Sequence, residues 1–171
     1  MNFDFTESRI EWEHNNENKV YYVDNIEFAS YEKKLIYIEI CNDSGYEYRY
    51  IDLNGTDIVW YTENGMLSIF GIKKKTIKLE QIEDVMIIGD NIFVMFSDKE
   101  EKKISEYSRN GEFKRQYTPP LHYSFYRFTE FEDKIAVICQ EDNPTDKYGR
   151  KDWKFVYNEI SAGWEKKSLA Y

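Results

Sequence analysis

The sequence is poor in the residues that form disulfide cross-links or bind a metal. Its 171 residues include only 2 cysteines and 2 histidines. Cys41 and Cys139 do not form a Cys-x-x-Cys motif, so we expect buried, reduced thiols and neither a disulfide nor a zinc site. Neither His14 nor His122 has a further ligand at metal-binding spacing. We therefore expect no metal and no other cofactor.

The chain also lacks the apolar runs and leader segments that direct a protein to a membrane. No stretch approaches the roughly 20 apolar residues that a membrane-spanning helix needs. The N-terminus has neither the basic region nor the apolar region of a secretion signal. These absences predict a cytoplasmic protein that has no membrane partner.

The common catalytic signatures are missing as well. The sequence contains no Gly-x-Ser-x-Gly elbow, phosphate-binding glycine loop, dinucleotide fingerprint or His-Glu-x-x-His motif. One enzymatic route remains, because a glycosidase needs only two carboxylates that face each other across a cleft. Asp52 and Asp57 flank an Asn-Gly turn, and three further carboxylates crowd another turn: Glu130, Glu132 and Asp133. Carboxylates at turns usually bond to the local backbone. We predict a protein that is not an enzyme, with a carboxylate-based carbohydrate-active hydrolase or lyase as the alternative.

What the sequence does contain is a strand pattern that occurs three times. Apolar runs at 35–40, 92–96 and 135–139 each follow a charged or polar turn, and a tight turn containing glycine follows each run further along the chain. Because one small sheet cannot bury its own apolar face, such repeats must stack on their neighbours. With 18% aromatic residues, the pattern predicts an all-β fold of antiparallel sheets in a single domain, residues 1–171. Continuous apolar runs mark strands covered on both faces, which predicts these core residues: Ile36, Ile38, Phe93, Met95, Ile135 and Val137.

The repeats have definite predicted bounds. They comprise half a unit at 9–23 and three full units at 26–63, 85–117 and 124–171. Two further strands, at 66–72 and 76–80, fit the repeat less well, and a short helical turn near 80–84 stays open. The long loop at 141–152 is a candidate functional segment, because long loops on regular scaffolds often carry function.

The units resemble the blades of β-propeller proteins. The resemblance rests on a strand that ends in an Asn-Gly turn and leads into a strand with an aromatic residue, as at 107–113. It covers residues 26–171 with a break at 64–82, and no Gly-His or Trp-Asp blade signature accompanies it. The resemblance implies a small propeller-like or incomplete-propeller architecture. A rolled antiparallel sheet or a sandwich is the alternative.

The charge of the chain is unevenly distributed. Residues 1–63 contain 14 acidic and 5 basic residues, so this segment carries the whole net charge of −9. An acidic field of this kind repels nucleic acid and accelerates the encounter with a basic partner. It also serves simply to keep a protein soluble. The balance predicts a basic protein partner and no nucleic acid.

Aromatic residues accompany the acidic ones in this segment. Tyr46, Tyr48 and Tyr50 alternate along one predicted strand and share a face, which is either core or a displayed recognition surface. Tyrosine and tryptophan are enriched among the residues that contribute most to protein interfaces. The candidate partner-binding residues are therefore acidic or aromatic: Glu11, Trp12, Glu13, Glu47, Asp52, Asp57, Trp60 and Tyr61.

Together these features predict a non-catalytic protein-binding module. One particular form is a small acidic cytoplasmic immunity protein, an antidote that masks a basic toxin domain. Two other classes stay open, the carboxylate-based hydrolase or lyase and a structural piece of a larger assembly, which would leave a sheet edge for another chain.

Overall fold

The computed structural model describes residues 2–99, 101–142 and 151–170. Their regular structure consists of antiparallel β-strands without a helix, which confirms the all-β prediction. In this part of the chain, accordingly, there is no helix long and apolar enough to cross a membrane. Most of the predicted loop at 141–152 lies outside the described residues.

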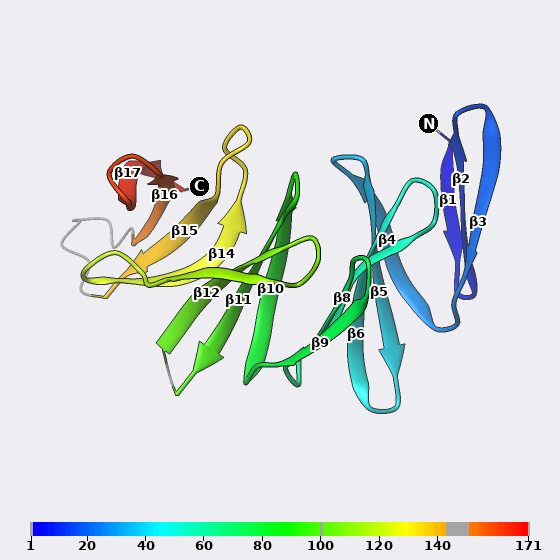
Figure 1. Ribbon diagram of the computed structural model, residues 1–171, viewed down its shortest axis with the longest axis horizontal. Coiled ribbons are helices and arrows are strands. Elements are labelled where there is room, and N and C mark those ends of the chain that lie inside the picture. The colour runs from blue at the N-terminus through cyan, green and yellow to red at the C-terminus, as the bar shows by residue number, and fades with distance from the viewer. Residues whose placement is uncertain (1, 100, 143–150, 171) are drawn as a thin grey trace. The chain divides into compact units, whose positions relative to one another are not determined.

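The chain divides into two compact units. The first consists of Met1–Leu79 with Arg109–Gly111, and the second of Glu80–Ser108 with Glu112–Tyr171. Every sheet is a meander, in which neighbouring strands follow one another along the chain (Figure 1). The single domain expected for residues 1–171 stays a prediction.

The first unit contains a three-stranded and a six-stranded sheet. The three-stranded sheet consists of β1 (Phe3–Thr6), β2 (Arg9–His14) and β3 (Glu17–Tyr22). The six-stranded sheet consists of β4 (Ile26–Glu32), β5 (Leu35–Asn42), β6 (Gly45–Asp52), β7 (Asp57–Thr62), β8 (Met66–Phe70) and β9 (Lys74–Lys78). Ile10 and Trp12 of β2 pack with Ile36, Ile38 and Ile51 of the larger sheet in one core. Both sheets bury one apolar face in this core because their side chains alternate between faces.

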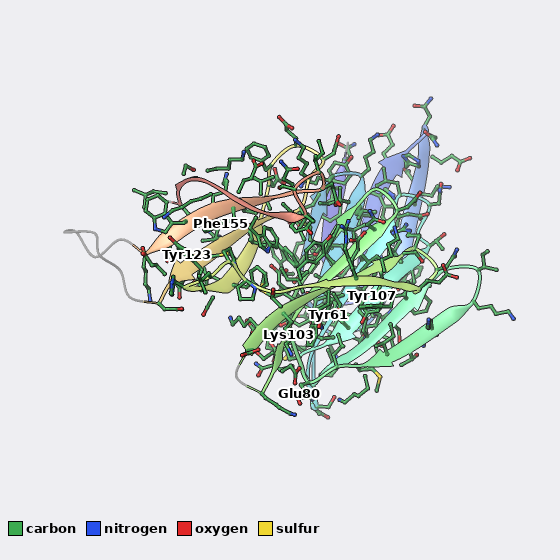
Figure 2. The ribbon with its side chains drawn as sticks, turned by 60° about the vertical axis from the view of Figure 1, so that its left-hand side comes forward. Tyr61, Glu80, Lys103, Tyr107, Tyr123 and Phe155 are labelled. Carbon is green, nitrogen blue, oxygen red and sulfur yellow. The ribbon has the colours of Figure 1, made fainter. Side chains whose placement is uncertain are left out.

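The second unit contains two four-stranded sheets. One consists of β10 (Gln81–Ile88), β11 (Asn91–Asp98), β12 (Glu101–Ser108) and β13 (Phe113–Tyr117). The other consists of β14 (Tyr123–Thr129), β15 (Ala136–Glu141), β16 (Asp152–Asn158) and β17 (Gly163–Leu169). Phe93 and Met95 of the first sheet pack with Phe125, Val137 and Phe155 of the second in one core. Tyr123 lies edge to face with Phe155 at a centroid distance of 4.9 Å (Figure 2).

The six predicted core residues are buried, each with at most 5% of its surface exposed. The run at 92–96 is buried at every position, which confirms a strand covered on both faces. Three details differ from the prediction or decide what it left open. β7 pairs with β8 in the register Val59 to Ile69, so the strands of 66–70 and 74–78 extend the sheet of the first full repeat. Strand β1 was not predicted, and residues 81–88 form a strand with no helical turn.

The two cysteines differ in exposure, which predicts a difference in reactivity. Cys139 is buried, as expected, and burial raises its pKa to about 12. Cys41 is partly exposed, so the expectation of a buried thiol is wrong at this position. The pKa of a free cysteine thiol is about 8.5. The contribution of the neutral Cys139 thiol to stability is therefore complete below that pH and is lost as the pH rises toward 12. At pH 8 we expect iodoacetamide to alkylate Cys41 and to spare Cys139 until urea unfolds the protein, as followed by mass spectrometry. Equal rates on the folded protein would contradict the burial of Cys139.

Candidate functional site

The outward face of the three-stranded sheet gathers acidic side chains. β2 alternates strictly, so Ile10 and Trp12 point into the core and Arg9, Glu11 and Glu13 point away from it. The register of the sheet then places the following residues on the same outward side, which we call the N-terminal face: Asp4, Thr6, Arg9, Glu11, Glu13, Asn18, Val20 and Tyr22.

The N-terminal face carries more negative than positive charge. Asp4, Glu11 and Glu13 are its three carboxylates, and Arg9 is its one basic residue. The Arg9 Nε lies 2.9 Å from a carboxylate oxygen of Glu11. Among the described residues, no basic side chain forms an ion pair with Asp4 or Glu13. The face therefore keeps two carboxylate charges for an approaching cation.

Exposed apolar side chains on the edge strand β3 and a hollow accompany these charges. Val20 is 43% exposed and lies opposite Glu11 in the sheet, and Tyr22 is 74% exposed and lies opposite Arg9. A hollow of about 510 Å³ is lined by residues of all three strands, including Phe3, Glu13 and Val20. The combination of an exposed tyrosine, an exposed valine and neighbouring carboxylates is typical of a protein-binding surface.

The structure places the other predicted site residues elsewhere. Trp12 is 3% exposed and Tyr61 is 4% exposed, so both are core residues and offer no contact area to a partner. The indole N–H of Trp12 donates to the carbonyl oxygen of Leu53 at 2.9 Å. Asp52 accepts hydrogen bonds from the backbone N–H groups of Asn54 and Thr56, each at 2.9 Å, and so fixes the Asn-Gly turn.

Glu47, Asp57 and Trp60 form a separate cluster around Arg49. The Arg49 Nε donates to Glu47 at 2.7 Å, and its Nη1 donates to the Tyr21 hydroxyl at 2.9 Å. That hydroxyl in turn donates to Asp57 at 2.8 Å, while the guanidinium lies 6.0 Å from the centre of the Trp60 ring. Burial raises the pKa of Tyr21, and its hydrogen bond to Asp57 adds to the effect. The cluster ties β3 to β6 and β7, and its charges are largely compensated internally.

The tyrosine face of β6 is partly exposed. Tyr46 is 36% exposed, whereas Tyr48 and Tyr50 are half-buried. The Tyr46 hydroxyl donates to Glu27 at 2.8 Å, and Glu27 raises the pKa of Tyr46 to about 12. Tyr48 stacks on Tyr46 and donates to Glu63 at 2.7 Å. The face is therefore neither wholly core nor wholly surface, and each of these two hydroxyl groups already donates to a carboxylate.

The described residues contain no group of His, Cys, Asp or Glu side chains arranged to hold a metal ion. The sequence matches no protein-family model, and the comparison with curated proteins found no significant match. The function is therefore inferred from the geometry and the charges of the described residues. Sequence reasoning missed Asp4, Val20 and Tyr22, although the alternation of 3–6 could have indicated a strand that brings Asp4 beside Glu11.

Proposed function

We propose that this chain is a non-catalytic protein-binding module that binds a basic protein through the N-terminal face. One observation carries the proposal: Asp4, Glu11 and Glu13 of β1 and β2 share one side of a single sheet with exposed Val20 and Tyr22 of the edge strand β3. The carboxylates steer and orient a cationic partner, while Val20 and Tyr22 supply apolar area that is removed from water. The particular role we propose is that of a cytoplasmic antidote that masks a basic toxin domain.

The net charge of residues 1–63 also favours a basic partner. The whole net charge of −9 lies within residues 1–63, which include the N-terminal face. Because the field of many charges extends over about 8 Å at physiological salt and about 30 Å at 0.01 M, association with a basic partner should be fast and salt-dependent. A stable complex needs more area than three short strands alone offer, so residues next to the face belong to the proposed interface.

The alternative of a carboxylate-based hydrolase has less support. Asp52 bonds to the backbone of its own turn, and Asp57 accepts a hydrogen bond from Tyr21. Asp57 also lines a small hollow of about 200 Å³, in which it is the only carboxylate. Glycoside hydrolysis requires two carboxylates across one cleft. The predicted pair therefore does not supply that arrangement.

For the architecture, we propose that the sheets are blades of a small propeller-like fold. The order of strands within each sheet, a meander of neighbours, is that of a propeller blade and supports this proposal. A sandwich or a rolled sheet contains the same meanders and is the alternative.

The test reverses charge on the face and measures association. Affinity capture from the source cell lysate compares wild-type bait with a triple variant, Asp4→Lys, Glu11→Lys and Glu13→Lys, and association rates of any captured protein are then measured between 0.01 and 0.15 M salt. We expect the triple variant to slow association by about 10-fold or more at low salt. Its thermal unfolding should change little, because exposed charges contribute little to stability.

A matched control carries the same kind of change in the second unit. Glu101→Lys with Glu112→Lys reverses two exposed carboxylates there and should leave association within about 2-fold. Tyr22→Ala should speed dissociation instead, because it removes apolar contact and no charge. The proposal fails if the captured partner is acidic, or if the triple variant and the control behave alike.

A further inference from the structure

The second unit contains a cavity that the proposed binding function does not use. Its volume is about 400 Å³, within the range of small-molecule sites, and residues of both four-stranded sheets line it. Phe93, Ile135, Val156 and Tyr157 form apolar walls. Glu106 reaches the cavity from β12, and it is only 2% exposed. Charged side chains, among them Asp133, Lys134 and Glu165, complete the lining. A buried carboxylate is costly unless its oxygens are hydrogen-bonded.

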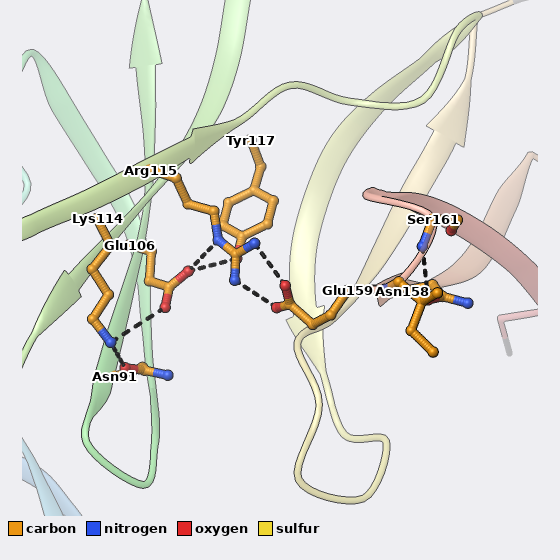
Figure 3. Close-up of polar contacts among 9 residues, drawn as sticks. Asn91, Glu106, Lys114, Arg115, Tyr117, Asn158, Glu159 and Ser161 are labelled. Carbon is orange, nitrogen blue, oxygen red and sulfur yellow. Dashed lines mark hydrogen bonds and ion pairs between the residues drawn. The ribbon is translucent and has the colours of Figure 1, made fainter.

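The two oxygens of Glu106 have unequal partners (Figure 3). Oε2 accepts from the Nε of Arg115 at 2.7 Å and from the hydroxyl of Tyr117 at 2.6 Å. Oε1 has only the ammonium of Lys114 near it, at 3.8 Å, which is longer than a hydrogen bond. Within the described ranges no donor hydrogen-bonds to Oε1. This oxygen therefore keeps its capacity to accept from a ligand.

Arg115 is paired with two carboxylates, whose charges disfavour an anion at this side chain. Its Nη1 and Nη2 donate to the two oxygens of Glu159 at 2.7 and 2.5 Å, and its Nε donates to Glu106. The hydrogen bonds to Glu159 raise the pKa of Arg115 further. Such a fork on two carboxylates fixes the guanidinium rigidly. Two lysines also line the cavity, and each forms an ion pair with a glutamate, Lys134 with Glu132 at 3.7 Å and Lys167 with Glu165 at 2.6 Å. The buried polar side chain of the cavity, Glu106, offers an acceptor.

The side chain of Lys114 can move away from Glu106 Oε1. Its side chain is 42% exposed, and its ammonium also donates to the amide oxygen of Asn91, which lines the cavity. A long, exposed lysine side chain loses little when it turns toward water. The position between Glu106 Oε1 and Asn91 Oδ1 thus already accommodates an ammonium group.

We propose that this cavity binds a small primary amine. Its ammonium donates to Glu106 Oε1 and Asn91 Oδ1, and its aliphatic chain lies against Phe93, Ile135 and Val156. Lys114 occupies the ammonium position in the free protein and competes with the ligand. This site is independent of the N-terminal face, so failure of either proposal leaves the other intact.

Calorimetric titration of the full chain with n-butylamine tests the proposal. We expect Lys114→Met to bind the amine about 10-fold more tightly than the wild type, because it removes the competing ammonium. Glu106→Gln, alone or combined with Lys114→Met, should reduce affinity at least 10-fold. Lys151→Met, a matched change at an exposed lysine of the second unit, should have no effect. Nitrogen-15 NMR shifts confined to the cavity locate the binding.

Further ligands test whether the cavity recognises the ammonium group and whether that group belongs to a free amine or to a lysine side chain. 1-Butanol and butyrate should not bind, because neither supplies an ammonium group. Nα-acetyl-lysine methylamide distinguishes a free small amine from a lysine side chain of a protein: binding of n-butylamine alone indicates the free amine, as proposed. Since Lys114→Met alters an exposed side chain and should fold normally, an unchanged amine affinity in that variant overturns the proposal. Binding of butyrate in preference to the amine overturns it as well.

Discussion

Replacing Phe93 by alanine is expected to lower the free energy of unfolding by about 3–5 kcal/mol, the usual cost of removing a buried phenylalanine ring. Phe93 is 4% exposed and belongs to the core cluster of the second unit. The centre of its ring lies 6.3 Å from the centre of the Tyr117 ring. Because it also lines the cavity beside Glu106, the space left by the ring would join an existing void and would not close. The expected loss therefore lies toward the upper end of the range.

Urea denaturation measures this loss, and Phe113 provides the control. Phe113 belongs to β13 of the same unit and is 59% exposed. Phe113→Ala should change the free energy of unfolding by at most about 0.5 kcal/mol. If Phe93→Ala were equally mild, the ring of Phe93 would have to lie at the surface, and the inward register of β11 would be incorrect.

The sequence was informative about this core because the signal is local. The run at 92–96 is apolar at five successive positions, and a strand buried on both faces is the simplest structure that accommodates it. The attachment of β8 to β7 was not predictable in the same way. Its register depends on which strand edge is free to pair, and that is a property of the folded sheet. Strand β1 alternates apolar and polar residues, but four residues are few for a periodic signal, and the alternation there was overlooked.

The candidate site was only partly predictable for a related reason. Glu11, Trp12 and Glu13 are neighbours in sequence, and the alternation of a strand separates the tryptophan from the two carboxylates. That separation follows from the sequence once β2 is recognised as a strand. The association of Arg49 with Tyr21 and Asp57 does not, because it brings together three strands through the register of two sheets. The charge composition predicts where the acidic segment lies, whereas the fold determines which of its carboxylates are unpaired and exposed to a partner.

Trp12 is expected to contribute stability and no contact area to a partner, and its substitution separates these two roles. Trp12→Ala should lower the free energy of unfolding by about 3–5 kcal/mol, because the side chain is 3% exposed in the core of the first unit. Its ring also supports the Asn-Gly turn: a Cβ at Gly55 would lie 3.6 Å from the Trp12 Cη2, and Gly55 has a φ of +84°. Removing the ring therefore loosens both the strand and the turn.

Trp12→Phe keeps an aromatic ring in the core but removes the indole N–H together with part of the ring volume. The carbonyl oxygen of Leu53 then loses its donor, which should cost about 1–3 kcal/mol. Tyr22→Ala, on the exposed side of the same sheet, should cost no more than about 0.5 kcal/mol. Chemical denaturation orders the three variants, and binding kinetics of any captured partner should order them differently. Tyr22→Ala should weaken binding most, whereas Trp12→Phe should leave binding nearly unchanged as long as the protein is folded. A Trp12→Phe variant that folds normally but loses its partner would place the indole in the interface and would contradict its burial.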